Sequence, residues 1–265
     1  MSGFLSRVLV ALIGVPVVLG LVYLGGWWLF GLAALAGVIA LHEFYVMARP
    51  LRPLVLAGYG GSAAALVGAQ LGGIEWMVGG FLATFLLAFF LFLVATTRAP
   101  ATVAISGTVL GASWLGFGLG FVLLLRDLGP HGRLAAFTVV IAVWADDTAA
   151  YLMGRLVGRH KFSPALSPAK TWEGFVAGTA AAIFVAFVAL YQERHQFLTI
   201  GEAIVLGAVV AVAAAFGDLF ESALKRDMQV KDSGTILAGH GGMLDRLDAL
   251  LFAVPAAYFT IVVLS

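Results

Sequence analysis

The chain has 265 residues, of which 62% are hydrophobic and only 11% are charged. Soluble globular domains carry about 25% charged residues, so this composition excludes a soluble fold and indicates a membrane protein with several spans. The absence of cysteine excludes disulfide bonds, thiolate zinc sites and cysteine nucleophiles. The formal net charge of +1 argues against the basic surface that nucleic-acid binding requires, so we expect no nucleic-acid partner.

Apolar runs of about bilayer length follow one another along the chain. They lack the period-2 alternation of barrel strands and therefore predict transmembrane helices. No small-x-small cleavage site follows the first run, so we expect it to remain as an anchor rather than to be removed as a signal peptide. If the runs flanking Gly25-Gly26 merged into one hairpin, the number of spans would fall and the termini would change sides. The nine predicted spans are Val8–Leu24, Trp27–Leu41, Leu54–Leu71, Trp76–Thr97, Val103–Leu125, Leu134–Gly154, Phe175–Tyr191, Ala203–Phe220 and Leu247–Leu264.

Basic residues are distributed unevenly between the two sides that nine spans would define. Only Arg126, Arg133 and Arg194 fall on the side opposite the N-terminus. Positive charge marks the cytoplasmic side, which predicts a cytoplasmic N-terminus and an outside C-terminus. The basic residues on the N-terminal side are Arg7, Arg49, Arg52, Arg98, Arg155, Arg159, Lys161, Lys170, Lys225, Arg226, Lys231 and Arg246.

These patterns predict an all-α, polytopic transmembrane helical bundle of about nine spans. No linker marks a separate soluble domain, so we expect one integral membrane domain over residues 1–265. Its N-terminal helices would occupy residues 1–133, and its catalytic helices and cytoplasmic motif loops residues 134–265. Small-xxx-small spacings such as Gly68/Gly72 favour close helix packing. They are compatible with a homodimer but do not establish one.

Two polar stretches interrupt the hydrophobic sequence, one from Asp146 to Gly174 and one from Phe216 to Asp248. A charge near the centre of a span costs about 2.5–3.5 kcal/mol on insertion scales, so charged residues inside spans are functional candidates. Spacings of three and four residues place Asp218, Glu221, Ser222, Lys225 and Arg226 on one face of a continuing helix. Aspartates bind hard cations such as Mg²⁺, and basic side chains neutralise phosphate charge. The residues therefore predict metal-assisted phosphoryl or nucleotidyl transfer at the cytoplasmic face.

The second stretch also resembles a known sequence signature. It contains Ser222-Ala-Leu-Lys225-Arg226, then Lys231-Asp232, then His240-Gly241-Gly242-Met243-Leu-Asp245-Arg246-Leu-Asp248. This pattern resembles that of the phosphatidate cytidylyltransferase (CDP-diacylglycerol synthase) family. The blocks Asp147-Thr-Ala-Ala-Tyr151 and Ser167-Pro-Ala-Lys170-Thr171-Trp-Glu173-Gly174 are also similar to family motifs. The matching blocks lie in the C-terminal half, and Ala238 departs from the Pro, Gly or Ser usual before the glycine-rich turn.

The resemblance implies transfer of a cytidylyl group from CTP to phosphatidic acid, giving CDP-diacylglycerol and pyrophosphate in phospholipid biosynthesis. It also implies a divalent cation, Mg²⁺ or another, and leaves a second cation open. CTP, phosphatidic acid and membrane lipids would be the partners. We expect the bacterial inner membrane as the location, with the active site facing the cytoplasm.

The candidate residues have assigned roles, each with an alternative. We expect Asp218, Asp245, Asp248 and Asp147 to bind metal. The alternative role of Asp245 is to cap a helix, and that of Asp248 is to pair with Arg246. Asp146 is a less favoured metal ligand than its neighbour Asp147. His240 could act as an acid or donate to phosphate, or only brace its turn, and the role of Glu43 is undecided. The catalytic candidates are Asp218, Asp245, Lys225, Arg226, Arg246 and His240, and the substrate-binding candidates are Ser167, Lys170, Thr171, Glu173, Ser222, Lys231, Asp232, Gly241 and Gly242.

Two other functions fit parts of the pattern. A CTP-dependent kinase of a polyprenol or another membrane lipid could use similar basic loops but would transfer the γ-phosphate. An ion-coupled transporter could use the intramembrane aspartates, although the polar motifs gather at one face.

Overall fold

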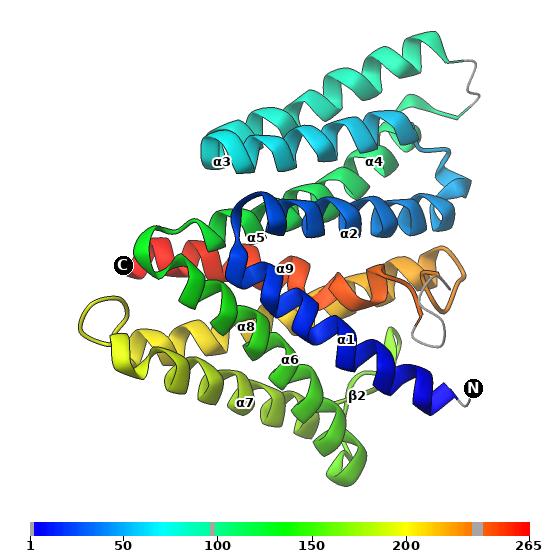
Figure 1. Cartoon of the computed structure of the whole chain (residues 1–265). Coiled ribbons are helices and arrows are strands. Elements are labelled where there is room, and N and C mark those ends of the chain that lie inside the picture. The colour runs from blue at the N-terminus through cyan, green and yellow to red at the C-terminus, as the bar shows by residue number, and fades with distance from the viewer. Residues whose placement is uncertain (1–2, 96–98, 235–240) are drawn as a thin grey trace. The chain divides into compact units, whose positions relative to one another are not determined.

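The structure is a computed structural model, and it describes residues 3–95, 99–234 and 241–265. Its chain forms two compact units, each built from two stretches of sequence and almost wholly helical (Figure 1). Unit 1 comprises residues 1–127 and 227–247, and unit 2 comprises residues 128–226 and 248–265. The predicted single domain, with N-terminal helices over residues 1–133 and catalytic helices over residues 134–265, stays a prediction. Residues 227–247 belong to the same unit as the N-terminal helices.

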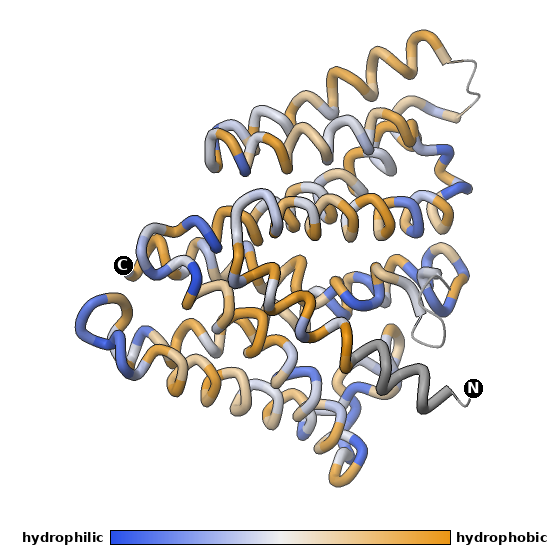
Figure 2. The backbone as a smooth tube through the Cα atoms, viewed as in Figure 1, coloured by the Kyte–Doolittle hydropathy of each residue, from blue (hydrophilic) through white to orange (hydrophobic). Residues whose placement is uncertain are grey.

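Seven helices within the described residues are long and apolar enough to cross a membrane. Hydrophobic residues run along the helices, whereas hydrophilic residues gather at helix ends and in connections (Figure 2). The predicted all-α polytopic class is therefore confirmed, while the count of nine spans and the orientation of the termini stay predictions.

The described residues of unit 1 form five α-helices and the first turn of a sixth. A glycine pair ends the first helix, because Gly25 and Gly26 have φ angles of 65° and 50°, and the two runs flanking this pair are separate helices. The Arg126 side chain donates from Nε to the Val22 carbonyl at 2.8 Å and from Nη2 to the Tyr23 carbonyl at 3.1 Å. It thereby satisfies carbonyl groups that a helix C-terminus leaves unpaired. The elements of unit 1 are α1 (Gly3–Leu24), α2 (Gly26–Met47), η1 (Arg49–Leu51), α3 (Val55–Val94), α4 (Ala101–Gly111), the π-helical turn η2 (Ala112–Phe117) and α5 (Gly118–Arg126), followed by the start of α9 (Leu244–Leu264).

Helix α3 doubles back on itself at Gly73, whose φ of 71° and ψ of −156° break the helix. Its two halves correspond to the third and fourth predicted runs. Glycines let their backbones approach closely: a Cβ on Gly61 would collide with Thr84, and one on Gly68 would lie 2.8 Å from the Met77 nitrogen. The small-xxx-small spacing at Gly68 therefore serves helix packing within the chain.

Replacing Gly68 by Ala should lower the stability of unit 1, because the new methyl group would press on the backbone of the opposite half of α3. Overpacking of this kind costs about 1–3 kcal/mol, which thermal unfolding of the detergent-purified protein would detect. Gly79→Ala is the matched control, because a Cβ there meets nothing within 4 Å. Equal melting temperatures for the two variants would contradict the packing of the α3 halves.

Unit 2 is built around the paired helices α6 and α7. Gly174 and Gly178 of α7 face α6, where a Cβ on Gly174 would lie 2.7 Å from the Ala150 carbonyl oxygen and one on Gly178 would lie 2.9 Å from that of Asp146. Helix α8 approaches α7 through Gly207, next to Ile183, and approaches α9 through Gly217. The elements of unit 2 are η3 (Gly129–His131), α6 (Gly132–Val157), β1 (Lys161–Ser163), β2 (Ser167–Thr171), α7 (Trp172–Leu190), η4 (Tyr191–Glu193), α8 (Ile200–Asp227) and the remainder of α9.

The segment between α6 and α7 forms an antiparallel hairpin in which Lys161 pairs with Thr171 and Ser163 with Ser167. The strands of this hairpin were not among the predicted elements. The ring of Phe162 stacks on Phe175 with centroids 5.2 Å apart and meets the edge of Trp172 at 4.6 Å. These ring contacts hold the hairpin against the start of α7.

Candidate active site

A cavity of about 580 Å³ opens in unit 2 between α6, the β hairpin, α7 and α8. Its wall combines acidic, basic and hydroxyl side chains with small apolar ones. The chemistry-bearing residues that line it are Asp146, Asp147, Tyr151, Arg155, Ser167, Lys170, Thr171 and Asp218.

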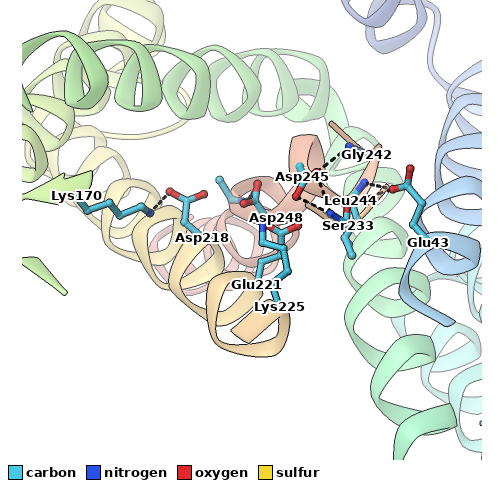
Figure 3. Close-up of polar contacts among 11 residues, drawn as sticks. Glu43, Lys170, Asp218, Glu221, Lys225, Ser233, Gly242, Leu244, Asp245 and Asp248 are labelled. Carbon is cyan, nitrogen blue, oxygen red and sulfur yellow. Dashed lines mark hydrogen bonds and ion pairs between the residues drawn. The ribbon is translucent and has the colours of Figure 1, made fainter. Parts of the chain in front are cut away.

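Lys170 and Asp218 form an ion pair across this cavity (Figure 3). Strand β2 carries Lys170, and Asp218 lies within the membrane-length helix α8. Their side chains are 29% and 23% exposed, so the pair is half-buried but reachable from the cavity. Each of the two residues was predicted as a site residue, and the structure brings them together.

Two neighbouring aspartates of α6 line the same cavity. Asp147 was predicted as a metal ligand and is exposed, whereas Asp146, which sequence reasoning set aside, is only 6% exposed. The carboxyl group of Asp146 lies close enough to Asp218 and Lys170 for their charges to act on it. Burying a carboxylate is costly unless it has partners, so we count the buried Asp146 as part of the site. The sequence alone did not identify it.

A second group of charges lies where α8 meets α9. Lys225 donates from Nζ to Oε2 of Glu221 at 2.7 Å, and the Glu221 side chain is only 2% exposed. Asp248 of α9 lies near the carboxyl groups of Glu221 and Asp218. Figure 3 shows the side chains of Glu221, Lys225 and Asp248 turned toward one another. Helices α8 and α9 can lie this close together because residue 217 is glycine; a Cβ there would press on the Asp248 backbone.

Glu221 was not among the predicted site residues, although its spacing from Asp218 and Lys225 was visible in the sequence. Its contact with Asp248 places two carboxyl groups side by side. Such a pair is stable only when a proton or a cation lies between the groups or close to them. In this structure Lys225 supplies part of that positive charge.

The acidic residues of unit 2 have the chemistry that a hard divalent cation requires, because carboxylate oxygen is the preferred ligand of Mg²⁺. Asp218, Glu221 and Asp248 come from two adjacent helices, and Asp146 and Asp147 come from a third. Over the described ranges, the structure holds no group of three acidic or histidine side chains already gathered around one point. Lys170 and Lys225 instead occupy carboxylate oxygens that would have to turn toward a metal.

Unit 1 holds a separate polar cluster at the start of α9. Asp245 accepts hydrogen bonds from the Gly242 N–H at 2.7 Å and from the Ser233 N–H at 3.3 Å. Both donors belong to residues that precede α9, so Asp245 holds the segment that leads into this helix, and its role as a helix cap stays a prediction. The Gly242 amide, which was expected to bind phosphate, points at Asp245 in this arrangement, so phosphate binding there stays a prediction. Asp245 and Asp218 belong to different units, and a metal ion shared between them also stays a prediction.

The remaining predicted residues fall into three groups. Thr171 accepts from the Gly174 N–H at 3.1 Å and caps α7, while Glu173 accepts from the His160 backbone and ring, so each has a structural partner. Lys231 and Asp232 are exposed near the cluster of unit 1, and His240 lies outside the described residues. Ser167 lines the cavity of unit 2, and Ser222 is half-buried on α8. Gly241 is half-buried and has a φ of 80°. Arg226, near the end of α8, and Arg246, near the start of α9, are exposed.

Comparison of the sequence with known proteins identifies a family for this chain. The model of the cytidylyltransferase family matches residues 5–264, nearly the whole chain. The chain belongs to the cytidylyltransferase family. It is therefore a nucleotidyltransferase enzyme, and the match includes the N-terminal helices, for which the sequence motifs gave no resemblance beyond hydrophobicity.

Individual relatives agree with this membership. A phosphatidate cytidylyltransferase of Staphylococcus haemolyticus (strain JCSC1435) is 34% identical over 254 residues, which cover 94% of this chain and 95% of the relative. A phosphatidate cytidylyltransferase of Bacillus subtilis (strain 168) is 37% identical over 158 residues, 59% of this chain and 58% of the relative. One from Staphylococcus aureus (strain COL) is 39% identical over 150 residues, 56% of this chain and 55% of the relative.

Proposed function

We propose that this chain transfers the cytidylyl group of CTP to phosphatidate, giving CDP-diacylglycerol and pyrophosphate with the help of a divalent metal ion. The phosphate oxygen of phosphatidate attacks the α-phosphorus of CTP. A new P–O bond forms as the bond from the α-phosphorus to the bridging oxygen breaks, and pyrophosphate leaves with that electron pair. The names of the relatives support these substrates. We place the site on the cytoplasmic side of a bacterial inner membrane, where CTP is available.

One structural observation carries the proposal, namely a charged cavity and an apolar groove that both lie against helix α8 within unit 2. The groove has a volume of about 800 Å³ and lies along α8 and α9. Its lining residues Leu166, Phe216 and Leu219 directly neighbour Ser167, Ala215 and Asp218 of the charged cavity in the sequence. A substrate with a charged head and apolar chains matches this pair of surfaces.

The residues of the cavity and of the charged group where α8 meets α9 have separate roles in the proposed reaction. Lys170 neutralises phosphate charge as negative charge moves to the pyrophosphate. Asp146, Asp218, Glu221 and Asp248 would hold the divalent ion, which supplies charge neutralisation and orients phosphate oxygens. The attacking phosphate is already anionic, so the reaction needs no strong general base.

Labelled CTP tests this proposal against a CTP-dependent lipid kinase. The purified protein is incubated with phosphatidate and CTP that carries ³²P at either the α or the γ position. We expect label from the α position in the lipid and label from the γ position in pyrophosphate. Label from the γ position in the lipid would support the kinase instead and would overturn the proposal.

Filling the apolar groove should impair the use of long-chain phosphatidate selectively. Ala213 lines the groove, and Ala213→Phe should reduce kcat/KM for dioleoyl phosphatidate roughly 10-fold, an effect typical of lost apolar contacts in a pocket. Dihexanoyl phosphatidate, whose chains are too short to fill the groove, should be used as well as before. Val205→Phe is the control, because Val205 is exposed on the same helix outside the groove. An equal loss with both lipids would show that the groove does not hold the acyl chains.

A further inference from the structure

Glu43 is a carboxylate buried in an apolar helix. Its neighbours Leu41 and Phe44 are fully buried in α2, and Glu43 itself is only 3% exposed. Burying a charged or polar group is costly unless hydrogen bonds compensate for lost water. A residue with this cost has a specific partner or a specific task.

The partners of Glu43 belong to the polar cluster of unit 1, about 200 positions later in the sequence. Its Oε2 atom accepts from the Leu244 N–H at 2.9 Å and from the Ser233 hydroxyl at 3.4 Å (Figure 3). Leu244 is the first residue of α9, so Glu43 satisfies one of the N–H groups that a helix N-terminus leaves unpaired. Its negative charge also interacts favourably with the positive end of the helix dipole. Within the described part of the chain, Oε1 of Glu43 has no hydrogen-bond partner.

The two glycines beside Glu43 leave it little room to move. A Cβ on Gly234 would lie 2.7 Å from the Glu43 carboxyl carbon, and one on Gly242 would lie 2.8 Å from the same atom. Only residues without a side chain therefore allow the carboxylate to reach this position. Glu43 and both glycines act as one packed contact between α2 and the segment that leads into α9.

This contact also reaches Asp245. Ser233 donates its hydroxyl to Glu43 and its backbone N–H to Asp245. Loss of the Glu43 carboxylate would release Leu244 and Ser233 together, and with them one of the donors that hold Asp245.

We infer that Glu43 is a positioning residue of this enzyme, which fixes the start of α9 and thereby the orientation of Asp245. The inference rests on the proposed function, because the sequence predicts Asp245 as a ligand of the metal ion that the proposed reaction uses. Glu43 acts through Leu244 and Ser233 and touches neither substrate.

Two conservative substitutions separate positioning from a direct role of the charge. Glu43→Gln keeps the length and one oxygen acceptor but removes the charge. Glu43→Asp keeps the charge but shortens the side chain by one methylene, so that it no longer reaches Leu244. A positioning role predicts that Glu43→Gln is milder than Glu43→Asp, whereas a charge acting directly on a metal predicts the reverse.

The test measures kinetics and backbone hydrogen exchange on the full-length protein in detergent. Removing a group that orients a ligand commonly costs 10- to 100-fold in activity or metal affinity, so we expect a loss of roughly that size in kcat/KM for CTP with Glu43→Asp. The KM for phosphatidate should stay unchanged, because the proposed lipid groove belongs to unit 2. Amide exchange in peptides covering residues 241–247 should accelerate in parallel. His42→Gln, which changes the exposed neighbour on α2, is the control.

Several outcomes overturn the inference. Wild-type kinetics and exchange in Glu43→Asp would do so, as would a milder effect of Glu43→Asp than of Glu43→Gln. If Glu43→Asp fails to fold, Ser233→Ala provides the test, since it removes only the hydroxyl link and should also lower kcat/KM for CTP. An unchanged kcat/KM for CTP in Ser233→Ala then overturns the inference. A wild-type protein that makes no CDP-diacylglycerol would instead contradict the proposed function itself.

Discussion

The substitution Asp218→Asn is expected to reduce kcat for cytidylyl transfer roughly 10²- to 10³-fold, the loss typical of removing one preorganised electrostatic group from an active site. Asp218 pairs with Lys170 and lies near the carboxyl groups of Asp146 and Asp248. The amide keeps the shape of the side chain but removes the negative charge that binds a cation. Steady-state turnover of CTP and phosphatidate over a series of Mg²⁺ concentrations measures the effect.

Asp227→Asn is the matched control, because Asp227 ends the same helix and is exposed. We expect the control to keep wild-type turnover. The metal requirement of the Asp218→Asn variant should also rise. Full turnover of that variant at the wild-type Mg²⁺ concentration would remove Asp218 from the site.

The substitution Lys170→Gln is expected to cause a loss of similar size, roughly 10²- to 10³-fold in kcat. Lys170 is the basic residue of the hairpin that lines the cavity of unit 2. Its removal takes away charge neutralisation from the leaving pyrophosphate and also the cation beside Asp218. Pre-steady-state transfer of α-label to lipid measures the chemical step directly.

Lys161→Gln serves as the control for Lys170→Gln, because Lys161 lies on the opposite strand of the same hairpin and is exposed. The double variant Lys170→Gln/Asp218→Asn should lose less activity than the product of the two single losses, since residues in one ion pair are energetically coupled. Independent, multiplicative losses would show that the pair does not act as a unit.

Apolar patterning was enough to predict the helices of this chain, because length and hydrophobicity dominate helix formation in a membrane. The break between the third and fourth predicted runs matches the reversal of α3 at Gly73. The hairpin of Lys161–Ser163 and Ser167–Thr171 could not be predicted in the same way. Its strands are short, and ring contacts of Phe162 with α7 hold it in place.

The candidate site was only partly predictable, since helical spacing shows which residues share a face but not which face meets another helix. Asp218 and Lys170 were identified from charge and motif. Asp146 was passed over in favour of Asp147 because a motif match does not report burial. The partners of Glu43 depend on tertiary contacts spanning about 200 residues, and no local pattern encodes such contacts.

We propose that the carboxylates of unit 2 bind the divalent ion that accompanies CTP. A structure of the enzyme with Mn²⁺ and a non-hydrolysable CTP analogue, in which the anomalous signal locates manganese, tests this proposal. We predict a manganese peak at coordination distance from Asp218 and from at least one of Asp146, Glu221 and Asp248. A well-occupied peak beside the analogue's phosphates that touches none of these four residues would contradict the claim.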